Sequence, residues 1–222
     1  MAFYELQASK IEAEVMKYHI DTQSWTSMQP RDGMSIAYRK SPHFNGHLYK
    51  FECVIDAPDD AIYDVMRPPL IREERLRWDN SVKDFQCIRN ISDEMMIGIF
   101  ITHSAGMGMI SSREFLDLYY FKKHIPSDDA EFDRISWILA GNIEVAERPI
   151  TSKYVRAHNH PTGYAVRRYK NNPNKSNLCL YINVDIGGMI PRSLIERFLP
   201  SQQVLYIESV KKEVFRRLGK AG

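Results

Sequence analysis

The chain has 222 residues, 44% of them hydrophobic, so it can bury a substantial core as one large domain or two small ones. Its 30 basic and 28 acidic residues are well mixed and leave a formal net charge of +2. This balance argues against nucleic-acid binding, since nucleic-acid binders usually carry a concentrated basic face. No stretch approaches the roughly 18 apolar residues of a membrane span, and the acidic N-terminus is unlike a signal or transit peptide.

The first predicted element is an amphipathic helix over residues 4–20, where Ala8, Ile11 and Val15 recur at helical spacing. Short strands follow. Residues 47–55 alternate apolar with charged side chains, which is typical of a strand with one solvated face.

Two short helices come next. Pro58 is expected to open the first, over about 58–66, and the Pro68-Pro69 pair to stop it. The second is expected over about 70–76. From residue 82 to residue 186 the pattern predicts β-structure, because apolar runs alternate with turn residues. The seven predicted strands cover about residues 82–91, 94–103, 113–123, 131–140, 152–158, 163–169 and 177–186.

A long helix is expected to close the chain, from Pro191 at its first turn to about Leu218. Pro200 should kink or restart this helix, because an interior proline removes a backbone hydrogen bond. The order of elements predicts an α+β fold in a single domain over residues 1–222, with a curved antiparallel sheet of about nine strands wrapped on the final helix. A cleft between that sheet and the helix is the expected binding site.

The three cysteines, Cys53, Cys87 and Cys179, are odd in number and have no metal-type spacing. Each lies in an apolar or alternating run, where a free cysteine behaves as a small hydrophobe. His158 and His160 would share one strand face, but a zinc site needs further ligands, and none lies at a suitable spacing. We therefore expect a reducing, cytoplasmic environment and neither a metal nor another cofactor.

Three segments, namely RLRWDNSV at 75–82, ISSREFLDL at 110–118 and AHNHPTGY…IERFLP at 157–200, together resemble the START (StAR-related lipid transfer) domain family. Within that family the chain is most similar to the small members that consist of the domain alone and bind sterols or bile acids. The resemblance implies a helix-grip fold around an internal hydrophobic cavity. It also implies a non-enzymatic, monomeric intracellular carrier that moves one sterol-like ligand between membranes through transient contact with their surfaces.

The resemblance places Arg75 in the cavity, where it would orient the polar end of the ligand. A buried guanidinium needs a partner, and Asp79 is a plausible one. The alternative is a solvated Arg75 in a run of mixed charges. The family's pattern also places Arg113 at the site, although this chain lacks the proline that usually precedes it. In some members this arginine pairs with an acidic residue on the preceding strand, for which Glu94 is the candidate.

The predicted strand 94–103 has one aliphatic face, which ends in His103. That histidine either bonds within the core or meets the polar tip of the ligand. Ile99 and Ile101, on the same face, are candidate ligand contacts. Ser136 is a further candidate polar group of the cavity, although a serine in a strand is more often unremarkable.

The segment 104–110 is a glycine-rich apolar loop, in which Gly106 and Gly108 give backbone freedom. The resemblance implies that this loop gates the cavity together with the final helix, and the alternative is a plain hairpin connection. The proposed gate and lid residues are Gly106, Met107, Gly108, Met109, Leu194 and Phe198.

The end of the final helix carries a basic cluster, Lys211, Lys212, Arg216, Arg217 and Lys220. These cations would either dock on anionic lipid or complement the helix dipole. Other functions remain open from sequence: a phospholipid or ceramide carrier, a ligand-sensing interaction module, or a hydrolase or cyclase using His103. A phosphocholine ligand would call for an aromatic cage, and the sequence does not place Trp137, Tyr164 or Tyr181 in one.

Overall fold

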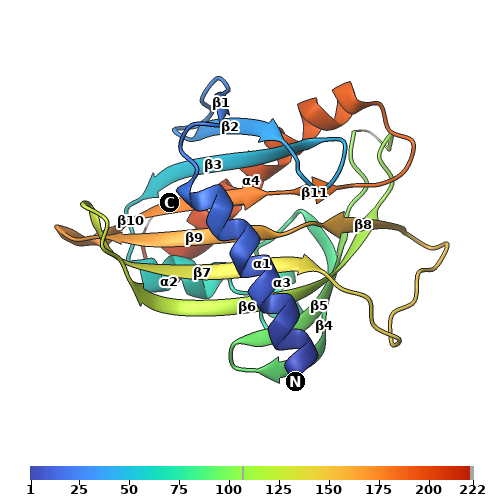
Figure 1. The fold of residues 1–222 in the computed structure, drawn as a ribbon, viewed down its shortest axis with the longest axis horizontal. Helices are drawn as coiled ribbons and strands as arrows, with labels where there is room; N and C mark the ends of the chain where they lie inside the picture. The colour runs from blue at the N-terminus through green and yellow to red at the C-terminus, as the bar shows by residue number, and fades with distance from the viewer. Residues whose placement is uncertain (107, 221–222) are drawn as a thin grey trace.

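The computed structural model describes residues 1–106 and 108–220, which form four helices and eleven strands (Figure 1). Their bounds are α1 Ala2–Ile20, β1 Thr26–Ser27, β2 Ser35–Lys40, β3 His47–Ile55, α2 Asp59–Met66, α3 Arg72–Leu76, β4 Val82–Ser92, β5 Met95–Thr102, β6 Arg113–Pro126, β7 Phe132–Asn142, β8 Val155–Asn159, β9 Thr162–Tyr169, β10 Asn172–Ile182, β11 Val184–Asp185 and α4 Arg192–Arg217. The predicted α+β class is confirmed.

The strands form one sheet in the order β1-β2-β3-β10-β9-β7-β6-β5-β4, to which β8 and β11 are added. The expected curved sheet of about nine strands, mostly antiparallel, is confirmed, and the structure adds one parallel pair, in which Arg113–Phe115 of β6 lie beside Val155–Ala157 of β8. A parallel neighbour needs a long connection, and the chain supplies one between β7 and β8.

The helix α1 crosses one face of the sheet (Figure 1), where its buried side chains pack on β5, β6, β7, β9 and β10. The approach is close because two glycines lie under the helix. A Cβ atom on Gly141 would come within 2.9 Å of Ile11, and one on Gly163 within 2.6 Å of Val15. Larger residues at these positions would push α1 away from the sheet.

The opposite face of the sheet packs against α4 and α2, which lie behind it in Figure 1. Along α4 the buried side chains are Pro200, Val204, Tyr206, Ile207, Val210, Glu213 and Val214. The helix continues through Pro200 rather than ending there. All of these residues except Pro200 lie between Val204 and Val214, so the C-terminal half anchors α4, whereas residues at its N-terminal end are exposed or half-buried.

The two edges of the sheet are irregular or short. The strand β1 has two residues. The strand β4 shifts register against β5 three times along its length. No helix in the described ranges combines the length and apolar character needed to cross a membrane.

An internal cavity with a charged pair

A cavity of about 280 Å³ lies between the sheet and α4. This volume is near the lower end of the range of about 300–1,000 Å³ for pockets that hold small molecules. Its apolar walls include Met66, Phe85, Phe100, Ile138, Ile182, Phe198 and Leu199. The cavity therefore offers an apolar ligand a site between the two layers of the fold.

The mouth of the cavity is marked by lining residues that are exposed. Exposed lining residues include Asn80, Ser81, His103 and Ser104, and Phe198 of α4 lines the same cavity. His103 thus lies at the mouth and not in the packed core, and its backbone N–H donates to the Ser81 carbonyl oxygen at 3.4 Å. The strand β5 directs it there because it is the first residue after the strand ends.

Arg75 lines the cavity and forms an ion pair with Asp79, with 2.6 Å between Nη2 and Oδ2. The other oxygen of Asp79 accepts hydrogen bonds from the backbone N–H and the hydroxyl of Ser81, at 3.0 and 2.6 Å. The guanidinium of Arg75 lies over the ring of Trp78, 4.7 Å from its centroid. The pairing that the sequence suggested is present, and the solvated alternative for Arg75 is wrong.

Three tyrosines, Tyr119, Tyr164 and Tyr206, also line the cavity close to this ion pair. Burial raises the pKa of each phenol, so all three are neutral hydroxyl groups at physiological pH. Among the described residues, the hydroxyl of Tyr206 and Nε of Arg75 have no hydrogen-bond partner. Such unpaired buried groups are rare, and here they lie beside an apolar cavity, where a ligand could satisfy them.

Arg113 lines the cavity near its mouth, but it binds backbone carbonyls. Its Nε donates to the Ile186 carbonyl at 3.0 Å and its Nη2 to that of Gly187 at 3.3 Å, and Nη1 bonds to Ser111. The suggested partner Glu94 was wrong, because β5 and β6 are antiparallel and place the two residues at opposite ends. Arg113 instead ties the β5–β6 connection to the loop before α4.

Two predicted ligand contacts face the wrong side of the sheet. Ile99 belongs to the cluster under α1, and Ile101 is not among the described residues that line the cavity. Side chains alternate along a strand, so their neighbours Phe100 and Thr102 line it instead. Ser136 is buried and is not among the described residues that line the cavity, and its hydroxyl accepts a hydrogen bond from the His124 N–H at 3.0 Å.

The loop 104–110 touches α4 at the mouth. Gly106 has a φ of +61°, and a Cβ atom there would lie 3.5 Å from the Phe198 ring. Gly108 has a φ of +89°, and the side chain of Met109 is 61% exposed. Met107 lies outside the described residues. On α4, Phe198 lines the cavity, whereas Leu194 is half-buried and not among the described lining residues.

One buried group at the site was missed from sequence. Asp117 is fully buried on β6, and the side-chain amide of Asn159, a cavity residue, donates to it at 2.7 Å. Burial raises the pKa of Asp117 to about 7, although the bond from Asn159 and the charge of Arg156 oppose the shift. The available signal was its position between Phe115 and Tyr119, which puts it on the cavity face of the strand.

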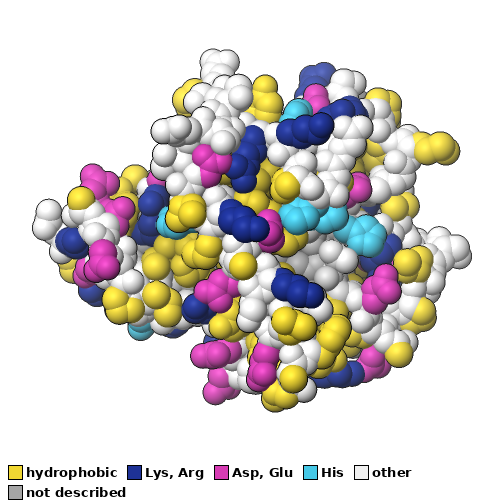
Figure 2. All heavy atoms as spheres, in the orientation of Figure 1, with side chains coloured by type: hydrophobic (Ala, Val, Ile, Leu, Met, Phe, Trp, Pro, Cys, Tyr) yellow, Lys and Arg dark blue, Asp and Glu magenta, His cyan; other side chains and the backbone are white. Residues whose placement is uncertain are grey.

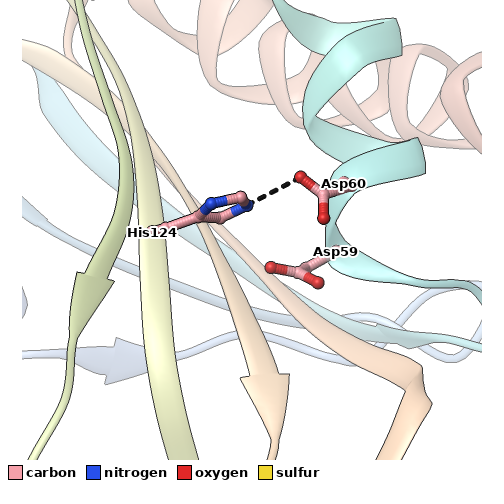
Figure 3. Close-up of side chains that lie close together, drawn as sticks. All are labelled: Asp59, Asp60 and His124. Atoms are coloured by element: carbon pink, nitrogen blue, oxygen red, sulfur yellow. Dashed lines mark hydrogen bonds and ion pairs between the residues drawn. The ribbon is translucent and has the colours of Figure 1, made fainter.

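Asp59, Asp60 and His124 lie close together, with possible ligand atoms within 4.8 Å of one another (Figure 3). Cations already bind these carboxylates: Arg134 makes two 2.8 Å bonds to Asp59, and Lys123 lies 2.9 Å from Asp60. Although burial opposes it, the hydrogen bonds from Lys123 and His124 lower the pKa of Asp60 to about 2. We interpret the cluster as an ion-pair network that fastens α2 to the sheet.

The basic cluster at the end of α4 is largely paired. Lys211 lies 2.8 Å from Glu208, and Arg216 and Arg217 both bind Glu213, at 2.6 and 2.8 Å. On the face that carries α1, Figure 2 likewise shows basic and acidic side chains interspersed. Three of the five cations thus pair with carboxylates of their own helix, and two of these three share Glu213.

A curved sheet that grips a long helix around an apolar cavity defines a class, the helix-grip α+β proteins with an internal binding space. The model of the START domain family matches residues 5–220, and the chain therefore belongs to that family.

Similar proteins cover nearly the whole chain. The StAR-related lipid transfer protein 5 of Bos taurus is 29% identical over 96% of this chain and 97% of its own length. The human StAR-related lipid transfer protein 6 is 28% identical over 92% of this chain and 88% of its own. The solved structure of human StAR-related lipid transfer protein 5 matches with a TM-score of 0.86 and 26% identity, covering 97% of this chain and 98% of that one. This chain is thus related to lipid transfer proteins.

Proposed function

We propose that this protein is a non-enzymatic carrier that binds one sterol-like lipid in its internal cavity and moves it between membranes. The observation that carries the proposal is the Arg75–Asp79 ion pair, which borders a largely apolar cavity beside an unpaired phenol. Apolar burial would supply the affinity, at roughly 25 cal/mol per Å². The polar groups would fix the orientation of the ligand. We further propose that residues 1–222 act as one monomeric cytoplasmic domain that contacts membranes transiently.

The chemistry of the pair favours a hydroxyl over a carboxylate. A hydroxyl can accept a hydrogen bond from Nε of Arg75 and donate one to Oδ2 of Asp79, which has no hydrogen bond of its own among the described residues. A carboxylate would bring a second negative charge next to Asp79, which is 1% exposed. We therefore infer a neutral sterol alcohol as the ligand rather than a bile acid.

The alternatives find less support in the geometry. Of the aromatic residues considered for a phosphocholine cage, Trp137 and Tyr181 pack under α1, and Tyr164 lines the cavity. For a hydrolase or cyclase, His103 would need Glu94 or Arg113 as a partner. Glu94 lies at the far end of β5, and Arg113 is bound to carbonyl oxygens.

The first experiment is native mass spectrometry of the protein after exposure to a mixed lipid extract. A 1:1 sterol adduct is expected. A phospholipid adduct would retain a carrier function but contradict the ligand class, and the lack of any lipid adduct would contradict the carrier. A bile-acid adduct would contradict the inference from the ion pair.

The second experiment removes the charged pair as a unit. Changing Arg75 alone would leave Asp79 as an unpaired buried charge, which costs about 3–5 kcal/mol and confounds binding with folding. The double variant Arg75→Met with Asp79→Asn avoids this. Cholesterol should bind the variant at least about tenfold more weakly, because a hydrogen bond between the hydroxyl and a charged group contributes roughly 1.5 kcal/mol or more. Cholestane, which lacks the hydroxyl, should bind equally to both proteins. An equal loss for both ligands would remove the pair from the site.

A further inference from the structure

Three connections lie at the end of the molecule that holds the mouth of the cavity (Figure 1). They join β5 to β6, β7 to β8 and β11 to α4. The first includes His103 and Ser104, which line the cavity. The parallel pair of Arg113 and Val155 brings the end of the β7–β8 connection beside the end of the β5–β6 connection. A Cβ atom on Gly187, in the β11–α4 connection, would lie 3.5 Å from the Val155 side chain. The three connections are therefore neighbours.

Each of these connections presents one large apolar side chain to the solvent. Met109 and Ile150, in the β5–β6 and β7–β8 connections, are 61% and 66% exposed, and Met189, in the β11–α4 connection, is fully exposed. Apolar side chains gathered at one exposed end of a protein mark a contact with a membrane or with another protein. A bilayer is fluid, so it can accept three separate side chains without a matching shape. This arrangement favours the membrane.

Two lysines at the same end have no ion-pair partner among the described residues. Lys83 directly follows Val82, which pairs with Thr102 at the end of β5. Lys153 belongs to the β7–β8 connection. The Nζ atoms of Lys83 and Lys153 lie 5.6 Å and 5.4 Å from the ring centroid of Tyr154. These three side chains form one group, the lysine–tyrosine cluster, which lies beside the mouth.

The charge around this cluster is positive. Arg113 binds carbonyl oxygens, and Arg148 binds the side-chain carbonyl of Gln86, so neither arginine is neutralised by a carboxylate. Against these two arginines and the two lysines stand Glu144 and Asp185, the carboxylates of this region that lack a cationic partner among the described residues. The excess of positive charge would attract an anionic surface.

We propose that this end of the molecule docks on membranes that contain anionic lipid, with the lysine–tyrosine cluster in contact with the headgroups. Lysine and tyrosine suit such a contact, because each has an apolar body and a polar tip that stays in water. The sequence suggested the end of α4 for this role, but three of its five cations are paired with carboxylates. The inference deepens the proposed carrier function, since it names the lipid surface and the residues that meet it.

Flotation of the full chain with sterol-free vesicles tests the docking surface. One set of vesicles is pure phosphatidylcholine, and the other contains about 30% phosphatidylserine as the anionic lipid. The informative variant is Lys83→Gln with Lys153→Gln, at exposed positions that are not among the described lining residues of the cavity. The matched control is Lys170→Gln with Lys175→Gln. It removes the same charge from the β9–β10 hairpin at the opposite end (Figure 1), where Lys175 lies 5.6 Å from the ring centroid of Tyr169.

The wild type is expected to bind the anionic vesicles at least about tenfold more tightly than the neutral ones. Lys83→Gln with Lys153→Gln should weaken binding to the anionic vesicles by about tenfold and leave binding to the neutral ones unchanged. The control should stay within about twofold of the wild type on both. The docking surface is overturned if the wild type does not prefer anionic vesicles. It is also overturned if both double variants lose equally, because only net charge would then matter.

Cholesterol binding by the same proteins separates this result from the carrier function. Lys83→Gln with Lys153→Gln should bind cholesterol as the wild type does, because neither lysine is among the described lining residues. A wild type that prefers anionic vesicles but binds no sterol would contradict the carrier and support the docking surface. A wild type that binds cholesterol without that preference would contradict the docking surface alone.

Discussion

Asp117 shows how strongly a single residue of the cavity wall depends on its surroundings. It is fully buried, it receives one hydrogen bond from Asn159, and its second oxygen has no partner among the described residues. Desolvation disfavours the charged form, which explains the raised pKa of about 7. The folded protein therefore holds a proton on this carboxyl that the unfolded chain releases at much lower pH.

The variant Asp117→Asn should change how stability depends on pH. Because the folded pKa of about 7 exceeds the ordinary value of 3.8, the wild type loses stability as pH rises from about 4 to about 7. The loss attributable to this group is roughly 4 kcal/mol at about 1.4 kcal/mol per unit. Urea unfolding across this range should give a flatter profile for Asp117→Asn. Asp128→Asn, on an exposed turn, should keep the wild-type slope, and a wild-type slope in Asp117→Asn would contradict the prediction.

At the residue scale, the sequence predicted the identity of the Arg75–Asp79 pair because a buried arginine must find a carboxylate close by in the chain. It misplaced Ile99 because both faces of β5 are apolar, so alternation alone could not say which face meets the cavity. Ser136 was misplaced for another reason: its hydroxyl bonds to the backbone at an irregularity of β6, and such a bulge leaves little trace in sequence.

At the scale of elements, the mouth of the cavity depends on contact between the loop 104–110 and the N-terminal half of α4. The C-terminal half is held by buried side chains, whereas the first turns are not. Moving α4 away from the cavity mouth therefore breaks fewer buried contacts near Phe198 than near Val210. We expect transfer to depend on this end of the helix and on the loop that touches it.

The variant Met109→Glu should slow lipid transfer between vesicles by about tenfold, because an exposed methionine loses roughly 1.5–3 kcal/mol of apolar burial at a membrane when it becomes charged. Equilibrium affinity should not change, since Met109 is outside the described lining of the cavity. Leu205→Glu is the control, at a 59% exposed position further along α4. Equal slowing by both variants would argue against a specific role of the loop.

Most elements could be predicted because periodic burial fixes them: α1, α2 and the long strands begin and end within a few residues of the expected positions. At Pro200, the local preference of proline did not decide whether the helix ends. A proline costs the helix a hydrogen bond, but this one is buried, and α4 continues through it. The parallel pairing of β8 could not be predicted, since strand patterns carry no direction.

At the scale of the whole molecule, the two faces of the sheet have different roles. The face under α1 is closely packed and contributes stability, and the face under α4 encloses the cavity. Substitutions under α1 should therefore alter the free energy of unfolding without altering what the cavity binds.

Gly163→Ala tests that separation. The added methyl would lie 2.6 Å from Val15 and 3.1 Å from Leu139, and overpacking of this kind costs about 1–3 kcal/mol of unfolding free energy. Lipid affinity should stay at the wild-type value. Combining Gly163→Ala with Val15→Ala should cost less than the sum of the two single changes, because the smaller side chain makes room. A strict sum, or a loss of lipid affinity, would contradict this account.

The two sheet edges have a consequence for behaviour in a crowded solution. Opening of the cavity would expose apolar side chains. A straight, unpaired edge strand beside them could then pair with a strand of another molecule. Here β1 offers two residues, and β4 is interrupted by three register shifts and carries charged Lys83, Asp84 and Arg89. An open molecule would thus be a poor template for fibril growth.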